Sequence, residues 1–228
     1  MVAAADHQAA QTALAGSLTE QLAPLWPLIQ EDNLDATIPK YSLAVSALVQ
    51  RYGQASAALA ASYYEAARQS ADVPGRFSVV PVSPADLETV TKGIGWATKG
   101  LWGDSPDTAT ARHLATATAE RYVLNTGRMT IISAANADRK SYGWARVVEP
   151  GACSFCLLLA TRGAVYRTEQ SSEFRSHDHC RCHAQPIFDA VYEPSAEVRR
   201  AQQIYKQVKA TAKGPAATRR AFRQALAG

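Results

Sequence analysis

Apolar residues recur at three- and four-residue intervals through most of the first 140 positions of the chain. Within residues 6–30 the spaced apolar positions are Leu14, Leu18, Leu22, Leu25 and Ile29. This period predicts an amphipathic helix, which Pro24 and Pro27 should bend or end. After a turn at residues 32–39, a second apolar stripe predicts an alanine-rich helix that ends at the Val73-Pro74-Gly75 break.

Two further helices are expected before residue 142. A Ser-Pro-Ala-Asp run that starts at Ser83 places a serine N-cap before a proline at the first helical position. Asp104 or Ser105 should cap a long helix that reaches about Arg139. Gly127 lies inside this long helix, where it costs about 1 kcal/mol relative to alanine.

The helical period stops after residue 142. Short β-prone runs replace it at residues 144–148, 164–166 and 187–191. Ser195 should then cap a last helix, and Gly214-Pro215 separates that helix from a final basic segment.

These patterns predict a mainly α fold, in which a helical N-terminal region and a long helix lead into a small α+β module and a basic C-terminal helix. With 228 residues, the chain can bury one substantial core, or a helical domain plus a smaller module. The expected segments are 1–105 (helical region), 106–142 (connecting helix), 143–192 (cysteine-containing module) and 193–228 (basic helical tail).

The formal net charge of +4 is unevenly distributed. Residues 193–228 carry eight basic and two acidic side chains, a net +6, so residues 1–192 carry −2. A basic tail on a slightly acidic body is typical of proteins that contact a polyanion, and double-stranded DNA is the first candidate. The alternative is a solvated helical face. The basic residues of this tail are Arg199, Arg200, Lys206, Lys209, Lys213, Arg219, Arg220 and Arg223.

The sequence indicates neither a leader peptide nor a membrane span. No basic stretch followed by an apolar run opens the chain, and no stretch approaches 18 uninterrupted apolar residues. We therefore expect a reducing cytoplasmic setting and no membrane partner. Clustered cysteines in that setting bind metal more often than they form disulfides.

All four cysteines lie in one window of thirty residues, in a Cys-x-x-Cys pair and a His-x-His-Cys-x-Cys cluster. Thiolates and imidazoles at this spacing are typical of a closed structural zinc site. A disulfide-bearing motif and free thiols are the alternatives. The candidate ligands are Cys153, Cys156, His177, His179, Cys180 and Cys182.

Six candidate ligands are too many for one tetrahedral ion. If the second cluster is extended, Cys180 and Cys182 lie on one face and the two histidines on the other. If the chain turns at Asp178, His177 and Cys180 converge instead. We favour the Cys-x-x-Cys pair with His177 and either Cys180 or Cys182; the set of four cysteines comes second.

Enzymatic uses of these residues lack supporting groups. A zinc deaminase needs a His-x-Glu element upstream, yet neither His7 nor His113 is followed by that glutamate. Cysteine-protease chemistry would need a pair such as Cys156 with His183. A zinc finger that reads base edges would need paired histidines in the final helix, which contains none.

Several runs resemble the phage head-morphogenesis minor capsid proteins of the Mu F-like family, of the actinobacteriophage type. They are Asn125–Arg128, Gly143–Cys156, Leu159–Tyr166 and His177–Cys182, so the resemblance covers about residues 110–190. The family pattern corresponds here to Cys153, Cys156, Gly163, Tyr166, His177, Cys180, Arg181 and Cys182.

The resemblance implies a structural minor capsid protein that assists procapsid assembly or DNA packaging and ejection near the portal. Its implied partners are the portal protein and the major capsid or scaffold protein. Its implied location is the host cytoplasm during assembly and then the capsid interior of the virion. Some relatives are labelled capsid maturation proteases, and that activity is the alternative; a DNA-binding zinc protein is the second. Because the chain has no Gly-x-Ser-x-Gly elbow and no distinct triad, we expect no catalytic residues.

Overall fold

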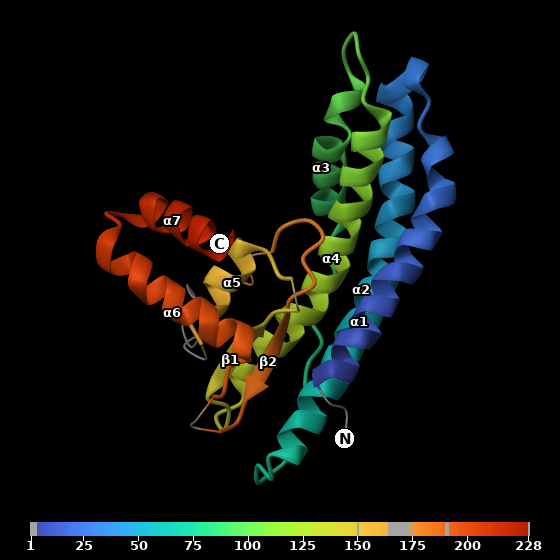
Figure 1. Cartoon of the computed structure of the whole chain (residues 1–228). Helices are drawn as coiled ribbons and strands as arrows, with labels where there is room; N and C mark the ends of the chain where they lie inside the picture. The colour runs from blue at the N-terminus through green and yellow to red at the C-terminus, as the bar shows by residue number, and fades with distance from the viewer. Residues whose placement is uncertain (1–3, 150, 164–173, 175, 190–191, 228) are drawn as a thin grey trace.

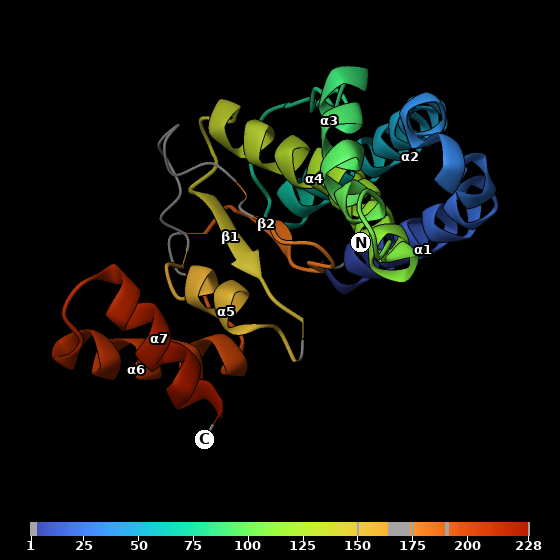
Figure 2. The same cartoon turned by 90° about the horizontal axis from the view of Figure 1, so that it is seen from above.

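The computed structural model is a V of two arms joined by a small sheet (Figure 1). It describes residues 4–149, 151–163, 174, 176–189 and 192–227. One arm contains the helices α1 to α4, and the other contains α5 to α7, with the sheet between them when the molecule is seen from above (Figure 2). The fold is mainly helical with a small α+β module, which confirms the predicted class.

The helices are α1 (Ala4–Leu22), α2 (Leu34–Ser70), α3 (Leu87–Ala97), α4 (Thr108–Ala137), α5 (Ser154–Ala160), α6 (Ala196–Thr211) and α7 (Pro215–Ala227). Short 3-10 helices cover Ala23–Leu28, Glu31–Asn33 and Lys99–Leu101, and the strands are β1 (Gly143–Val147) and β2 (His183–Ile187). The predicted division into four segments stays a prediction. α4 packs against both the other long helices and the sheet.

The helical arm is built as the apolar period predicts. Leu18 and Leu22 of α1, both buried, pack with apolar residues of α2, α3 and α4 in one core. α1 ends at Leu22, and the chain continues as a 3-10 helix through Pro24 and Pro27, so the expected ending at the prolines is confirmed.

Three helix starts differ from the prediction. α3 begins four residues after Ser83, because Asp86 is the N-cap and its Oδ1 accepts the Thr89 N–H at 2.8 Å. α4 is likewise capped by Asp107 rather than by Asp104 or Ser105. α2 already begins at Leu34 and includes Pro39 in its second turn; the burial of Leu34 and Ile38 against Leu101 and Ala111 stabilises this turn.

Gly127 marks a close crossing of α4 over α2. A Cβ atom at this position would lie 2.5 Å from the Ser56 hydroxyl and 3.0 Å from the Ser56 carbonyl oxygen. The side chains of Ser56 and Gln11 meet at the same point, where the Ser56 hydroxyl donates to the Gln11 amide oxygen at 2.8 Å. The helix penalty of this glycine is therefore offset by a helix crossing that a larger residue would prevent.

The sheet is an antiparallel pair in which Trp144 faces Pro186 and Val147 faces His183. β1 agrees with the predicted run at 144–148 to within one residue. β2 lies at 183–187 and shares only Ile187 with the predicted run at 187–191, of which residues 190–191 lie outside the described part of the chain. The segment His-Ala-Gln-Pro-Ile has little β propensity, and it becomes a strand because β1 and α4 lie beside it. The predicted run at 164–166 lies outside the described residues.

The basic C-terminal segment is packed on the module. Ser195 caps α6 as predicted, and its hydroxyl accepts the Val198 N–H at 3.3 Å. Val198, Ala201 and Phe222 are buried in the core that also contains Trp144 and three of the four cysteines. The final basic segment is thus a helix, α7, with a fixed place against α6.

The crossing at Gly127 yields a stability prediction. Gly127→Ala should lower the free energy of unfolding by about 1–3 kcal/mol, since the added methyl group overpacks the interface although alanine favours helix. Gly16→Ala is the matched control: no atom lies within 4 Å of its would-be Cβ, so it should raise stability by about 0.5–1 kcal/mol. Urea unfolding of both variants checks this, and equal effects of the two would contradict it.

Candidate metal centre

The sequence places two thiols at the start of a short helix. Cys153 is the N-cap of α5 and Cys156 lies in its first turn, so both side chains come from one tight segment. Gly151 before them has φ +78°, a conformation that lets the chain bend into the helix. The predicted Cys-x-x-Cys turn therefore exists, although sequence analysis missed the helix α5 that carries it.

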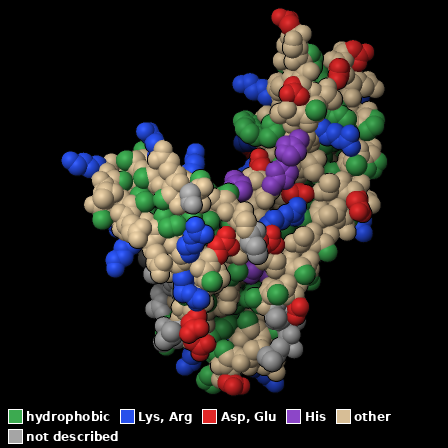
Figure 3. Space-filling view, in the orientation of Figure 1, with side chains coloured by type: hydrophobic (Ala, Val, Ile, Leu, Met, Phe, Trp, Pro, Cys, Tyr) green, Lys and Arg blue, Asp and Glu red, His purple; other side chains and the backbone are tan. Residues whose placement is uncertain are grey.

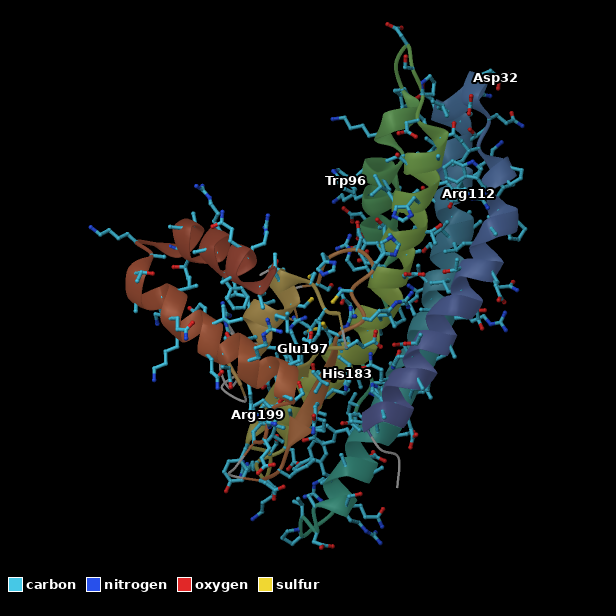
Figure 4. All side chains as sticks on the ribbon, in the orientation of Figure 1. Asp32, Trp96, Arg112, His183, Glu197 and Arg199 are labelled. Carbon is cyan, nitrogen blue, oxygen red and sulfur yellow. The ribbon has the colours of Figure 1, made fainter. Side chains whose placement is uncertain are left out.

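The structure brings five of the six candidate ligands together in two groups of three that share Cys156. In one, the ligand atoms of Cys153, Cys156 and His177 all lie within 4.8 Å of one another. In the other, the sulfur atoms of Cys156, Cys180 and Cys182 do so. Sulfur atoms gather between α5 and α4 in Figure 4. The described groups could hold a metal ion.

The histidine of this centre is oriented like a metal ligand. The His177 Nε2 lies 3.0 Å from the Cys153 sulfur and 3.4 Å from the Cys156 sulfur. Its Nδ1 lies 2.6 Å from the Asp178 carbonyl oxygen, so Nδ1 donates there and Nε2 is left as the acceptor atom. Cys180 completes the set most directly, because its sulfur is 3.6 Å from that of Cys156.

His179 points away from the thiols. Its backbone adopts φ +59°, and its Nε2 lies 2.9 Å from the Nε2 of His113 on α4. The Asp178–His179 turn therefore separates the two histidines: His177 faces the sulfur atoms, and His179 faces the long helix.

Two buried arginines supply positive charge that balances the negative charge of ionised cysteines. Arg128 of α4 donates from Nε to the Cys182 carbonyl oxygen at 2.9 Å and from Nη2 to the Cys180 carbonyl oxygen. Arg146 of β1 is 2 % exposed and stacks over the Phe174 ring at 3.7 Å. Burial lowers the pKa of Arg128 to about 10, and the nearby thiolates oppose that shift.

The pKa values of the neighbouring thiols depend on one another, because their sulfur atoms lie close together. Hydrogen bonds from Cys156 and Cys182, together with the charge of Arg128, hold the pKa of Cys180 far below its usual value. The same contact with Cys180 raises the pKa of Cys156 strongly, since a second thiolate beside the first is unfavourable. A bound cation would remove this conflict by allowing several thiolates at once.

The structure does not assemble the cysteine-protease pair that Cys156 and His183 would form. The His183 ring lies in β2 beside His7, with ring centroids 6.0 Å apart (Figure 4 labels His183). Burial lowers the pKa of His7 to about 4, and burial with the nearby charges of His7 and Arg128 lowers that of His183 to about 3. The four cysteines are free thiols, so no disulfide joins them.

Sequence analysis gave no role to Arg128, Arg146 or Glu120. A signal for Arg128 was present: at helical spacing it shares a face with the buried residues Leu124, Ile131 and Ala135. A charged residue on a buried helix face indicates an internal partner. Of the residues in the family pattern, Tyr166 lies outside the described part of the chain.

Seven of the eight basic residues proposed for DNA lie on α6 and α7, Lys213 lies between these two helices, and all eight are exposed. Arg199 and Lys206 are seven residues apart, so they share one face of α6. Arg219 and Arg223 are one turn apart on α7. No described helix is long and apolar enough to cross a membrane.

Comparison with known proteins gave one match. A protein-family model described as VG15 protein matches residues 1–208. No curated protein and no solved structure matches the chain.

Replacing single ligands should reveal which four bind the ion. Cys156→Ser should abolish metal binding, because Cys156 belongs to both groups, and Cys180→Ser should weaken it strongly. Cys182→Ser is the matched control and should retain one ion per chain. Cobalt titration checks this, since thiolate-to-cobalt absorption should lose one thiolate's intensity in Cys180→Ser and none in Cys182→Ser. The reverse order would instead place Cys182 in the set.

Proposed function

Because the chain belongs to the VG15 protein family, a phage-associated family, we propose that it is a structural minor capsid protein of a tailed bacteriophage. It assists procapsid assembly, or DNA packaging and ejection, near the portal. Its partners are the portal protein and the major capsid or scaffold protein, and it ends in the capsid interior.

The burial of the thiol cluster is the observation that carries a structural role. Cys156, Cys180 and Cys182 are 2–4 % exposed and belong to the same core as Trp144 and Phe174. An ion held there would join α5 to the 176–182 loop, which leads directly into β2. Such an ion contributes free energy to folding, as a staple does in a small module.

We propose that the ion is zinc. Thiolate sulfur and imidazole nitrogen are the donors that a structural zinc site prefers. Cys153, Cys156, His177 and Cys180 would hold it, while the Asp178 carbonyl oxygen fixes His177 and Arg128 offsets the net negative charge. Four protein ligands leave no coordination position for a substrate, which supports a structural centre over a catalytic one.

The basic helices support a contact with packaged DNA. The eight basic side chains of residues 193–228 are exposed on the arm of α6 and α7, which stands away from the long helices (Figures 1 and 3). Each phosphate that such a residue neutralises releases counterions, so binding would be independent of sequence and sensitive to salt. Arg199, for example, lies near the start of α6 (Figure 4), where its Nη1 donates to the Pro194 carbonyl oxygen at 2.7 Å.

Exposed aromatic residues at the far end of the other arm support a protein partner. Trp96 and Trp102 are 62 % and 46 % exposed, although large aromatic side chains are usually buried. Tryptophan is among the residues that contribute most to protein interfaces. The portal and the major capsid or scaffold protein are the partners we propose for this surface.

Assembly experiments test the capsid role. Co-expressed with the portal, scaffold and major capsid protein of its phage, the chain should co-sediment with procapsids, and heads assembled without it should package less DNA. Processing of the capsid precursor should be unaffected by its loss. The protease alternative predicts that the capsid precursor stays uncut when the chain is absent. The wild type would then restore cleavage, whereas a variant with a single nucleophile changed and its zinc retained would not.

Charge variants test the DNA contact. Lys206, Lys209 and Lys213 changed together to alanine should weaken duplex DNA binding and lower the salt slope by about one per lost phosphate contact. Removal of residues 193–228 is a poor test, because Val198 and Phe222 would leave the core. The control is a triple variant in which Lys92, Lys99 and Lys140 are changed to alanine, which removes the same amount of charge. If both triple variants weaken DNA binding equally, binding depends on overall charge and not on this segment.

A further inference from the structure

Three histidines line the inner wall of the V, where Figure 3 shows histidine side chains gathered along one arm. His113, His177 and His179 are the exposed histidines, whereas His7 and His183 are buried. His177 faces the thiols, which leaves His113 and His179 paired across α4 and the 176–182 loop. We propose that His113 and His179 form a second metal site, separate from the thiol cluster, which binds a divalent transition-metal ion through both Nε2 atoms.

The separation of the two nitrogen atoms fits a shared ion. The Nε2 atoms lie 2.9 Å apart. Two imidazole nitrogens bound at about 2.0–2.1 Å on adjacent positions of a square or octahedral ion are about 2.9 Å apart, against about 3.3 Å on a tetrahedral ion. The pair therefore suits Ni²⁺ or Cu²⁺ better than Zn²⁺.

A buried carboxylate orients one of the two ligands. Glu120 is 5 % exposed, and its Oε1 accepts the Thr19 hydroxyl at 2.7 Å. Its Oε2 has no hydrogen-bond partner among the described residues, and it lies 3.6 Å both from the His179 Nδ1 and from the Arg181 Nη2. A carboxylate beside Nδ1 favours the tautomer with the proton there, which leaves the Nε2 lone pair directed at His113. Carboxylate, histidine and metal in this order are the usual arrangement around ligating histidines.

The loop conformation separates this site from the first. Since φ at His179 is +59°, the chain turns between His177 and Cys180, and the two histidines point to different partners. Neither His113 nor His179 belongs to the groups of three ligands found among the described residues. His179 lines the same hollow of about 230 Å³ as His177 and the four cysteines, but its Nε2 lies beside His113.

Two protein ligands leave the other coordination positions of the ion open. Because both histidines are exposed, water or a donor atom from a bound molecule can fill those positions. The ion would also join α4 to the loop that carries His177 and Cys180. We therefore expect the ion at this site to exchange with ions in solution more readily than an ion held by the buried thiols.

Nickel titration of the full chain tests the site. The chain is first given one equivalent of zinc, and Ni²⁺ binding is then followed by calorimetry. We expect one further ion per chain, at least tenfold weaker binding in His113→Ala and in His179→Ala, and about 10–100-fold weaker binding in Glu120→Gln. Arg112→Ala, a neighbouring exposed change on α4, is the control and should bind as the wild type does.

Each outcome decides the proposal. Loss of the nickel event in both histidine variants, with zinc content and circular dichroism unchanged, supports it. No second ion in the wild type, or equal binding by wild type and His113→Ala, overturns it and leaves the histidines as a hydrogen-bonded pair. Because both changes are on the surface and the zinc content is measured separately, failure here is distinguishable from failure of the thiol centre.

Discussion

The requirement to balance charge inside the small module constrains the rest of the molecule. The sulfur atoms of three buried thiols lie within 4.8 Å of one another, and only a cation allows several of them to ionise. Arg128 supplies one positive charge from α4, and its guanidinium donates to the carbonyl oxygens of Cys180 and Cys182. The module therefore cannot be separated from α4 without leaving a buried arginine unpaired, which is costly.

The same dependence explains why the two arms form one structure. α4 packs along α2 through small residues at the Gly127 crossing, and beyond that crossing its residues Ile131, Ile132 and Ala135 share a core with Trp144 of β1 and Ala184 of β2. Arg68 of α2 adds a buried ion pair with Asp138, at 2.9 Å, where α4 ends. The module is thus fixed to the end of a rigid bundle, while its basic helices and the opposite helical tips remain exposed.

This arrangement suits a protein that connects different components. The far end of the bundle exposes tryptophans, the α6–α7 arm exposes basic residues, and the inner wall between the arms exposes histidines. The buried cysteine centre stabilises the joint between these surfaces. A structural role in a phage head and an exchangeable ion on the inner wall are compatible, because the two sites share a loop but no ligand.

The sequence by itself determined the helical class, the helix that ends just before Pro24, the Ser195 cap and five residues of the cysteine centre. These follow from local rules: helical period, proline geometry, capping and ligand spacing. Only the tertiary structure decided the rest. β2 exists because β1 lies beside it, Gly127 is required because Ser56 crosses there, and His179 turns to His113, which lies 66 positions away in the chain. Contacts between distant segments carry no local signal, so no spacing rule could have supplied them.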